Sequence, residues 1–327
     1  MKKFVLVVAV LLISTLAWAA GGRQQAAGEA WEPSRTVDFI VTSSAGGGSD
    51  IFARILSDIL VREGYVNQTI VVTNDSAAVG EPARARVSGI RGAAADHTIM
   101  AFNSGDMMTM VTNTPRRVSQ FTPLGILATD FQLLYVSRTS RFQSFQDIMN
   151  AVNRGERIVA GGSRGDDMMT FQMLLDEMGW TEEQVAYIIS PSSAAAIVSA
   201  LGDHIDVVIS KPAAASSFVE AGELIPILAL APQRYTGNLA VAPTVSEVGP
   251  FNNVYYPVWR GIVGPAAMSA EAQVFWSNVF RKASENRIWR YDYIERFQLI
   301  PGFYDYRETT AYMTNFEREF LAGPGLR

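Results

Sequence analysis

The stretch "TVDFIVTSSAGGGSDIFARILSDIL", Thr36 to Leu60, joins three kinds of sequence that together decide the fold. The apolar run Val37–Val41 predicts a buried strand, and three consecutive glycines follow it. Beyond Ser49 and Asp50, apolar residues recur every three or four positions, which predicts a helix with one buried face. A strand, a glycine turn and a helix in this order are the repeating unit of α/β proteins.

A second stretch, "IVAGGSRGDDMMTF" at Ile158–Phe171, has the same order of strand, glycines with serine, aspartate and helix. Other apolar runs alternate with helical patterns along the chain, so we expect an α/β fold with mainly parallel sheets. The apolar run Gly125–Arg138 is interrupted at Thr129-Asp130, which indicates a crossing between two lobes. Leu224–Ala231 is a candidate for the return crossing.

Composition limits the class of protein. The chain has 327 residues, of which 48% are hydrophobic, and this is enough to bury the cores of two lobes. Its net charge is −5 and it has no block of basic residues, so non-specific nucleic-acid binding is not expected. The absence of cysteine excludes disulfides, thiolate catalysis and zinc–thiolate sites.

The N-terminus has the pattern of a secretory signal. Lys2 and Lys3 precede an apolar run that ends at Trp18, and Ala17-Trp18-Ala19 fits a small-x-small cleavage site. An uncleaved membrane anchor is the alternative, but the run is short for a span of about 20 residues. We expect a signal peptide at residues 1–20, cleaved near Ala19 or Ala20, a flexible tether at residues 21–34, and a periplasmic mature protein.

A glycine-rich turn that begins a helix directs backbone N–H groups toward the positive helix end, and so favours an anion. The nucleotide-binding patterns do not fit, because no lysine follows Gly46–Gly48 and Ile51 occupies the third glycine position of a dinucleotide loop. A purely structural turn capped by Ser49 remains the alternative for one loop. Two matching loops favour a binding role, and we expect Gly46–Gly48 and Gly162–Gly165 to face each other across a cleft.

The segment Gly161–Gly165 also fits the G-x-S-x-G pattern of serine hydrolases, with Ser163 as nucleophile. Of the two histidines only His204 follows Ser163, and it precedes a strand, whereas Ser163 ends one. These positions lie at opposite edges of a parallel sheet, so an exported esterase is the less favoured alternative. Two distant histidines without cysteine make a poor metal site, and no motif indicates a cofactor.

Several segments in a fixed order resemble the periplasmic substrate-binding receptors of tripartite tricarboxylate transporters, the Bug-type receptors, and most of all their tricarboxylate-receptor branch. The resemblance extends from residue 36 to the C-terminus. The matching segments are "AGGGSDIFAR", "ADHTIM", "TPLGILATDFQLLYVSRTSRFQSFQDIM", "GGSRGDDMM", "LGDHIDVVIS", "VEAGELIPILALAPQR", "APTVSEVG" and "WRGIVGP".

This resemblance implies a type II clamshell binding protein with a mainly parallel sheet in each lobe and a ligand cleft between the lobes. Lobe one would comprise residues 35–127 plus 231–327, and lobe two residues 128–230. The protein would not be an enzyme. As a monomer it would capture a small di- or tricarboxylate and deliver it to membrane permease subunits by transient docking. A ligand-sensing partner of a membrane sensor is the alternative role.

The resemblance also implies which residues bind the ligand. In lobe one they are Ser43, Ser44, Gly46, Gly47, Gly48, Asp50, Asn103 and Ser104; in lobe two they are Gly162, Ser163, Arg164, Gly165, Asp166, Ser192, Ser193, Ser210 and Lys211. Arg164 is the first candidate to hold a carboxylate, because its planar fork can bind two oxygens, and Lys211 and Arg260 come after it. Alternatively, Arg164 is a solvated charge or pairs with Asp166 or Asp167.

Overall fold

The computed structural model describes residues 31–323 of the chain. From Glu32 onward the described residues form one compact unit. The predicted signal peptide, its cleavage site and most of the predicted tether lie outside the described residues. No helix among residues 31–323 is long and apolar enough to cross a membrane.

The first sheet has six strands in the order β11-β4-β10-β3-β1-β2. Strand β1 runs parallel to β2 and β3, β10 runs antiparallel to β3 and β4, and β11 pairs antiparallel with β4. The strands are β1 (Val37–Val41), β2 (Ile70–Asn74), β3 (Thr98–Asn103), β4 (Phe121–Asp130), β10 (Val258–Pro265) and β11 (Ile300–Tyr304).

The second sheet has five strands in the order β7-β6-β8-β5-β9. Strand β6 runs parallel to β7 and β8, and β5 runs antiparallel to β8 and β9. The strands are β5 (Gln132–Ser137), β6 (Ile158–Ser163), β7 (Val185–Ser190), β8 (Val207–Ser210) and β9 (Leu224–Leu230).

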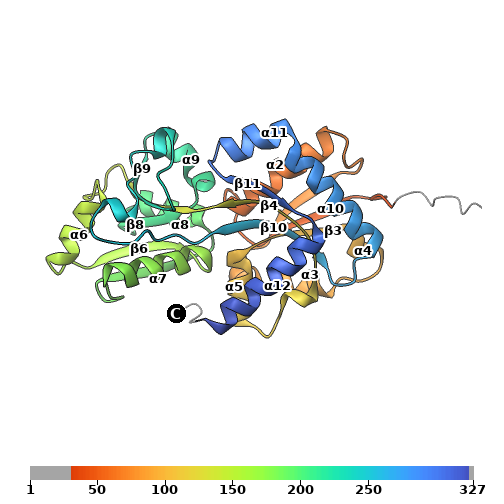
Figure 1. Ribbon diagram of the computed structural model, residues 1–327, viewed down its shortest axis with the longest axis horizontal. Coiled ribbons are helices and arrows are strands. Elements are labelled where there is room, and N and C mark those ends of the chain that lie inside the picture. The colour runs from red at the N-terminus through yellow and green to blue at the C-terminus, as the bar shows by residue number, and fades with distance from the viewer. Residues whose placement is uncertain (1–30, 324–327) are drawn as a thin grey trace, which may run out of the picture. The chain divides into compact units, whose positions relative to one another are not determined.

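Both sheets are therefore mixed and not purely parallel: most strands of each sheet run in one direction, but β10 and β11 are reversed in the first sheet and β5 is reversed in the second. The reason lies in the strands that connect them. Strand β4 leads the chain out of the first sheet and β10 returns beside it, so the two must run in opposite directions (Figure 1). Buried strands of either direction read as similar apolar runs, and the sequence therefore did not distinguish them.

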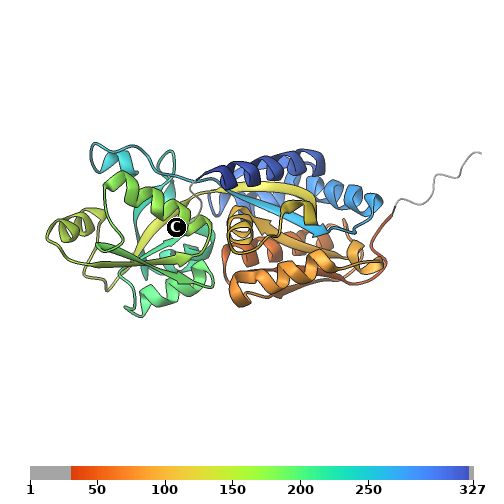
Figure 2. The same ribbon diagram turned by 90° about the horizontal axis from the view of Figure 1, so that it is seen from below.

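Helices cover both faces of the first sheet (Figure 2). In α2, for example, Phe52, Leu56 and Leu60 form a buried apolar stripe. The helices are α2 (Gly48–Arg62), α3 (Glu81–Gly89), α4 (Ala93–Asp96), α5 (Ser104–Asn113), α6 (Phe145–Asn153), α7 (Asp166–Met178), α8 (Ser193–Leu201), α9 (Pro212–Glu220), α10 (Ala270–Glu285), α11 (Arg287–Trp289) and α12 (Tyr306–Ala322), with short 3-10 or π turns η1 (Ala77–Gly80), η2 (Val118–Gln120), η3 (Gly237–Leu239), η4 (Val245–Glu247) and η5 (Arg290–Glu295).

The outward crossing lies where the interrupted apolar run predicted it: β4 ends at Asp130 and β5 begins at Gln132. The return crossing does not lie at Leu224–Ala231, because β9 occupies this segment and pairs with β5 inside the second sheet. A strand buried at six of its seven positions resembles a crossing strand in sequence, which explains the wrong assignment.

The segment between β9 and β10 packs with the second sheet. Val245 and Val254 belong to the same buried cluster as Ile158 and Val207. Leu239 and Ala242 join a neighbouring cluster on that sheet. The amide of Ala229 also donates to the carbonyl of Pro243 at 2.7 Å. The chain thus leaves the second sheet after Val254, which places most of residues 231–254 beside the second sheet and not the first.

Candidate ligand-binding site

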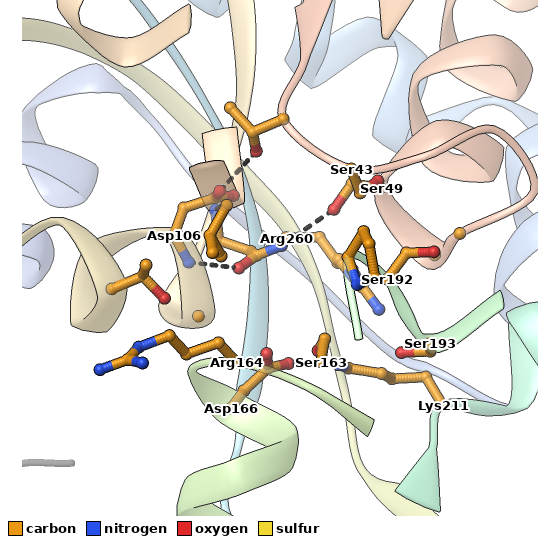
Figure 3. A pocket seen from close by; sticks show the side chains of 18 residues that line it. Ser43, Ser49, Asp106, Ser163, Arg164, Asp166, Ser192, Ser193, Lys211 and Arg260 are labelled. Carbon is orange, nitrogen blue, oxygen red and sulfur yellow. Dashed lines mark hydrogen bonds and ion pairs between the residues drawn. The ribbon is translucent and has the colours of Figure 1, made fainter. Parts of the chain in front are cut away.

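One cavity is lined by residues that come from helices and loops of both sheets (Figure 3). It holds about 60 Å³ of free volume, which corresponds to a few water-sized spheres. Ten of the predicted ligand-binding residues line it: Ser43, Gly47, Gly48, Asn103, Ser163, Arg164, Asp166, Ser192, Ser193 and Lys211.

The other seven predicted residues do not line the cavity: Ser44, Gly46, Asp50, Ser104, Gly162, Gly165 and Ser210. Asp50 has a structural role instead, because its carboxylate accepts hydrogen bonds from the Gly46 amide, from Arg54 and from Asn74 at 2.9 Å. These hydrogen bonds hold the pKa of Asp50 below its usual value, against the opposing effect of burial. That the predicted residues contact a ligand remains a prediction.

Four helices begin at the wall of the cavity. Their N-cap residues are Gly47 for α2, Asn103 for α5, Gly165 for α7 and Ser192 for α8. Gly47 replaces the predicted cap Ser49, which lies inside the first turn of α2. Positive helix ends gathered around one space favour an anion there.

The two predicted glycine loops line the same cavity, but the nearest neighbour of each is another helix start. A Cβ on Gly47 would lie 3.5 Å from Ser192 Cβ, so the α2 loop faces the start of α8. Gly165 faces Gly105 at the start of α5, where a Cβ would lie 2.6 Å from the Gly105 carbonyl oxygen. A Cβ on Gly105 would in turn overlap the Asp166 carboxylate. The two sheets thus contribute opposed pairs of helix starts, α2 with α8 and α5 with α7.

A buried cluster of three charges forms the wall on the side of the second sheet. Lys211 Nζ lies 2.6 Å from Asp166 Oδ2 and 2.6 Å from Asp167 Oδ1. Lys211 thus donates a hydrogen bond to Asp167 and forms an equally short ion pair with Asp166. Burial lowers the pKa of Lys211, but the two carboxylates outweigh it and the net pKa is raised.

Asp166 and Asp167 differ in their partners although both are buried. Asp167 Oδ2 accepts hydrogen bonds from the Ser163 amide at 3.0 Å, from Ser163 Oγ at 2.6 Å and from Ser193 Oγ at 2.8 Å. Burial raises the pKa of Asp166, and Lys211 opposes this only in part. Asp167 is thus fully engaged, whereas Asp166 lines the cavity.

A buried ion pair lies beneath the α2 loop. Arg260 Nη2 donates to Asp130 Oδ2 at 2.6 Å, and both side chains are at most 2% exposed. Arg260 Nε is buried and has no hydrogen-bond partner among residues 31–323. A Cβ on Gly48 would lie 2.8 Å from Arg260 Nη2, so the glycine allows the guanidinium to approach the loop. Burial raises the pKa of Asp130, and Arg260 opposes the rise.

The prediction omitted seven residues that line the cavity: Thr42, Ser49, Val79, Gly105, Asp106, Thr109 and Pro191. Asp106 pairs with the buried Arg84 at 3.0 Å, and Ser49 accepts a hydrogen bond from Asn103 at 2.9 Å. A usable signal was present in "NSGDMM", where a glycine and an aspartate follow a strand as they do in the two glycine loops. Arg260, predicted only as a weaker candidate, also lines the cavity.

The site offers no support for a serine hydrolase. Ser163 Oγ donates to Asp167, and β6 runs parallel to β8, so His204, which precedes β8, lies toward the opposite sheet edge from Ser163. Among residues 31–323 no group of three or more His, Cys, Asp or Glu residues is arranged to hold a metal ion.

Residues 53–299 match the sequence pattern of a protein family described as "Tripartite tricarboxylate transporter family receptor". The chain belongs to this family. Receptors of the family are periplasmic. No curated protein sequence matches the chain. The predicted family and the predicted α/β, two-lobed binding-protein class are thereby confirmed, with mixed sheets.

Solved structures share the fold of this family member at low sequence identity. Periplasmic binding protein BugD is 16% identical, with a TM-score of 0.74, covering 89% of this chain and 98% of BugD. MatC from Rhodopseudomonas palustris, with bound malate, is 15% identical, with a TM-score of 0.75 and coverage of 89% and 97%. R. palustris Rpa4515, with adipate, is 19% identical, with a TM-score of 0.76 and coverage of 89% and 96%.

Proposed function

We propose that this chain is a periplasmic receptor that captures a small organic acid between two lobes and delivers it to a membrane permease. The convergence of four helix N-termini from both sheets on one cavity carries the proposal, because such helix ends favour an anion. Family membership and the malate and adipate in two structural neighbours support a carboxylate as ligand. We infer no catalytic role.

We further propose that each lobe is built on one sheet and that the lobes separate to admit the ligand. The chain passes between the sheets near Phe131 and again between Val254 and Val258. Two short connections beside the paired strands β4 and β10 are suited to act as a hinge. This division changes the predicted lobe boundaries at residues 128–130, which belong to β4 of the first sheet, and at residues 231–254.

Calorimetry with the mature protein tests the function. A panel of mono-, di- and tricarboxylates is compared with a neutral sugar, a simple amine and an uncharged aromatic compound. We expect at least one carboxylic acid to bind and Arg164→Ala to weaken it by about tenfold, because a charge-assisted hydrogen bond is lost. Arg154→Ala is the control, since Arg154 is 61% exposed and pairs with Glu156 at the surface.

Binding of a sugar, an amine or an aromatic compound without any carboxylic acid would contradict the proposal. Unchanged affinity in Arg164→Ala would remove Arg164 from the site but leave the function standing. Hydrolysis of an activated ester that Ser163→Ala abolishes would restore the enzyme alternative. Ligand uptake that requires both this protein and the permease subunits separates transport from the sensor alternative, in which the ligand changes gene expression without uptake.

A further inference from the structure

A left-handed turn forms part of the cavity wall on the side of the first sheet. Ala78, Val79 and Gly80 follow one another with φ angles of 43°, 57° and 79°. Residues with a Cβ avoid this region, because the Cβ then lies too close to the following carbonyl oxygen, and a β-branched residue such as valine suits it least. Val79 nevertheless lines the cavity. A strained turn of this kind persists only where its surroundings hold it in place.

Arg84 of helix α3 holds the turn. Its side chain is 1% exposed, and its Nη2 donates to the Val79 carbonyl at 2.7 Å. The same guanidinium donates through Nη1 to Asp106 Oδ1 at 3.0 Å and through Nε to Glu81 Oε2 at 3.2 Å. A planar guanidinium serves several acceptors at fixed angles, whereas the ammonium group of lysine is one compact point. Arg84 thus fixes the turn relative to the first turn of α5, where Asp106 lies.

The end of the turn is fixed by packing. A Cβ on Gly80 would lie 2.5 Å from Thr42 Cβ, so only glycine fits at this position. Thr42 Oγ1 in turn donates to Asp106 Oδ1, the oxygen that Arg84 also contacts. Thr42, Val79 and Asp106 all line the cavity, whereas Arg84 does not. One buried guanidinium therefore connects three lining residues, Val79 and Asp106 directly and Thr42 through Asp106.

We propose that Arg84 is a positioning residue of the ligand site: it holds the turn Ala78–Gly80 left-handed and so keeps Val79 and Asp106 in the cavity wall. The inference rests on the proposed function, because it concerns the binding of an organic acid in this cavity. Without the hydrogen bond from Arg84, the turn exchanges with relaxed conformations in which Val79 leaves the wall. The apparent affinity then falls in proportion to the fraction of molecules in the binding-competent form.

Calorimetry of Arg84→Lys tests the role of the guanidinium. The probes are the mono-, di- and tricarboxylates of the panel above, with malate and adipate among them, and the acid that binds the wild type most tightly is used with every variant. Arg84→Lys keeps the charge beside Asp106 but loses the planar fork. We expect the affinity to fall by about tenfold, the ratio that corresponds to the strain of one left-handed residue.

The matched control is Arg86→Lys. Arg86 lies on the same helix, is 52% exposed and pairs with Asp75 at 2.9 Å. The same exchange of arginine for lysine is expected to leave the affinity unchanged there, because Arg86 contacts neither the turn nor the cavity wall.

A second substitution separates positioning from plain structural support. Ala78→Gly relieves the strain at one position of the turn without changing a side chain of the cavity wall, because Ala78 is exposed and does not line the cavity. Added to Arg84→Lys, it should restore the affinity by about threefold or more, since the left-handed turn then needs less support. A merely structural role of Arg84 would let Ala78→Gly raise the unfolding temperature without any gain in affinity.

If Arg84→Lys does not fold, Glu81→Gln takes its place, because Glu81 orients Arg84 but is 21% exposed and lies outside the cavity. It should weaken the same acid, and Ala78→Gly should again restore the affinity. Wild-type affinity in the arginine or glutamate variant, or a loss that Ala78→Gly does not reduce, would overturn the inference and leave the carboxylate receptor intact. Failure of every acid in the panel to bind the wild type would overturn both.

Discussion

The two glycine loops share a sequence pattern and one hydrogen bond, but they differ in a single acid. In the α2 loop Asp50 accepts the amide of the residue four positions before it, Gly46, and in the α7 loop Asp167 accepts the amide of Ser163 in the same way. Asp50 and Asp167 are therefore equivalent. By that register Asp166 occupies the place of Ser49, and both line the cavity. The comparison shows that one acid per loop holds the turn, and that the second loop adds another.

The largest effect should come from removing the structural acid of the α7 loop. Asp167→Asn removes a buried negative charge that accepts hydrogen bonds from four groups on Ser163, Ser193 and Lys211. The buried charges that remain are then poorly compensated. We expect the free energy of unfolding to fall by about 3–5 kcal/mol, the cost of breaking a buried ion pair from one side. Urea denaturation followed by circular dichroism measures it.

The matched variant is Asp50→Asn in the other loop. Its partner Arg54 is about half exposed, so the loss should be smaller, about 1 kcal/mol. An equal or larger loss in Asp50→Asn would show that the burial of the ion pair does not set the size of the effect.

A smaller effect is expected where α5 meets α7. Gly105→Ala places a methyl group against the Asp166 carboxylate and 3.0 Å from its Cγ, so the two helix starts must move apart. We expect ligand affinity to fall by about tenfold, within the 1–3 kcal/mol that overpacking usually costs. Gly302→Ala is the control, since nothing lies within 4 Å of a Cβ there. Unchanged affinity would show that this contact is not part of the bound state.

The smallest effect, and one of opposite sign, concerns the additional acid. Because folding raises the pKa of Asp166, the folded chain binds that proton more tightly, and ionising the group costs stability. Asp166→Asn should therefore stabilise the ligand-free protein at neutral pH by about 1 kcal/mol.

The pH dependence makes this prediction sharper. The cost of ionising Asp166 is absent well below its ordinary pKa of 3.8 and increases as the pH rises toward the raised value. The advantage of Asp166→Asn, measured by thermal unfolding at several pH values, should thus disappear in acid. Asp50 behaves in the opposite sense: its lowered pKa gives stability that is present above 3.8 and is lost as the pH falls. A variant that is less stable at neutral pH would show that Lys211 needs Asp166.

The elements of the fold that depend on local sequence patterns could be predicted from the sequence. The strand, glycine turn and helix from Val37 to Arg62 follow from apolar spacing, and the crossing near Phe131 follows from one interrupted run. Arg260 could not be predicted in this way, because it lies inside the apolar strand β10. Its position beside the α2 loop depends on the pairing of β10 with β4, which brings it next to Asp130, 130 residues earlier in the sequence. Which helix starts oppose each other likewise depends on the relative position of the two sheets, and no local sequence pattern determines that position.

The contact between Gly105 and Gly165 has a thermodynamic consequence. Where two helix starts meet through long side chains, each side chain loses rotational freedom as the contact forms, and this entropy opposes association. Glycines have no side-chain rotamers, so the proposed approach of the lobes would cost little side-chain conformational entropy at this point. More of the free energy of ligand binding then remains available for recognition.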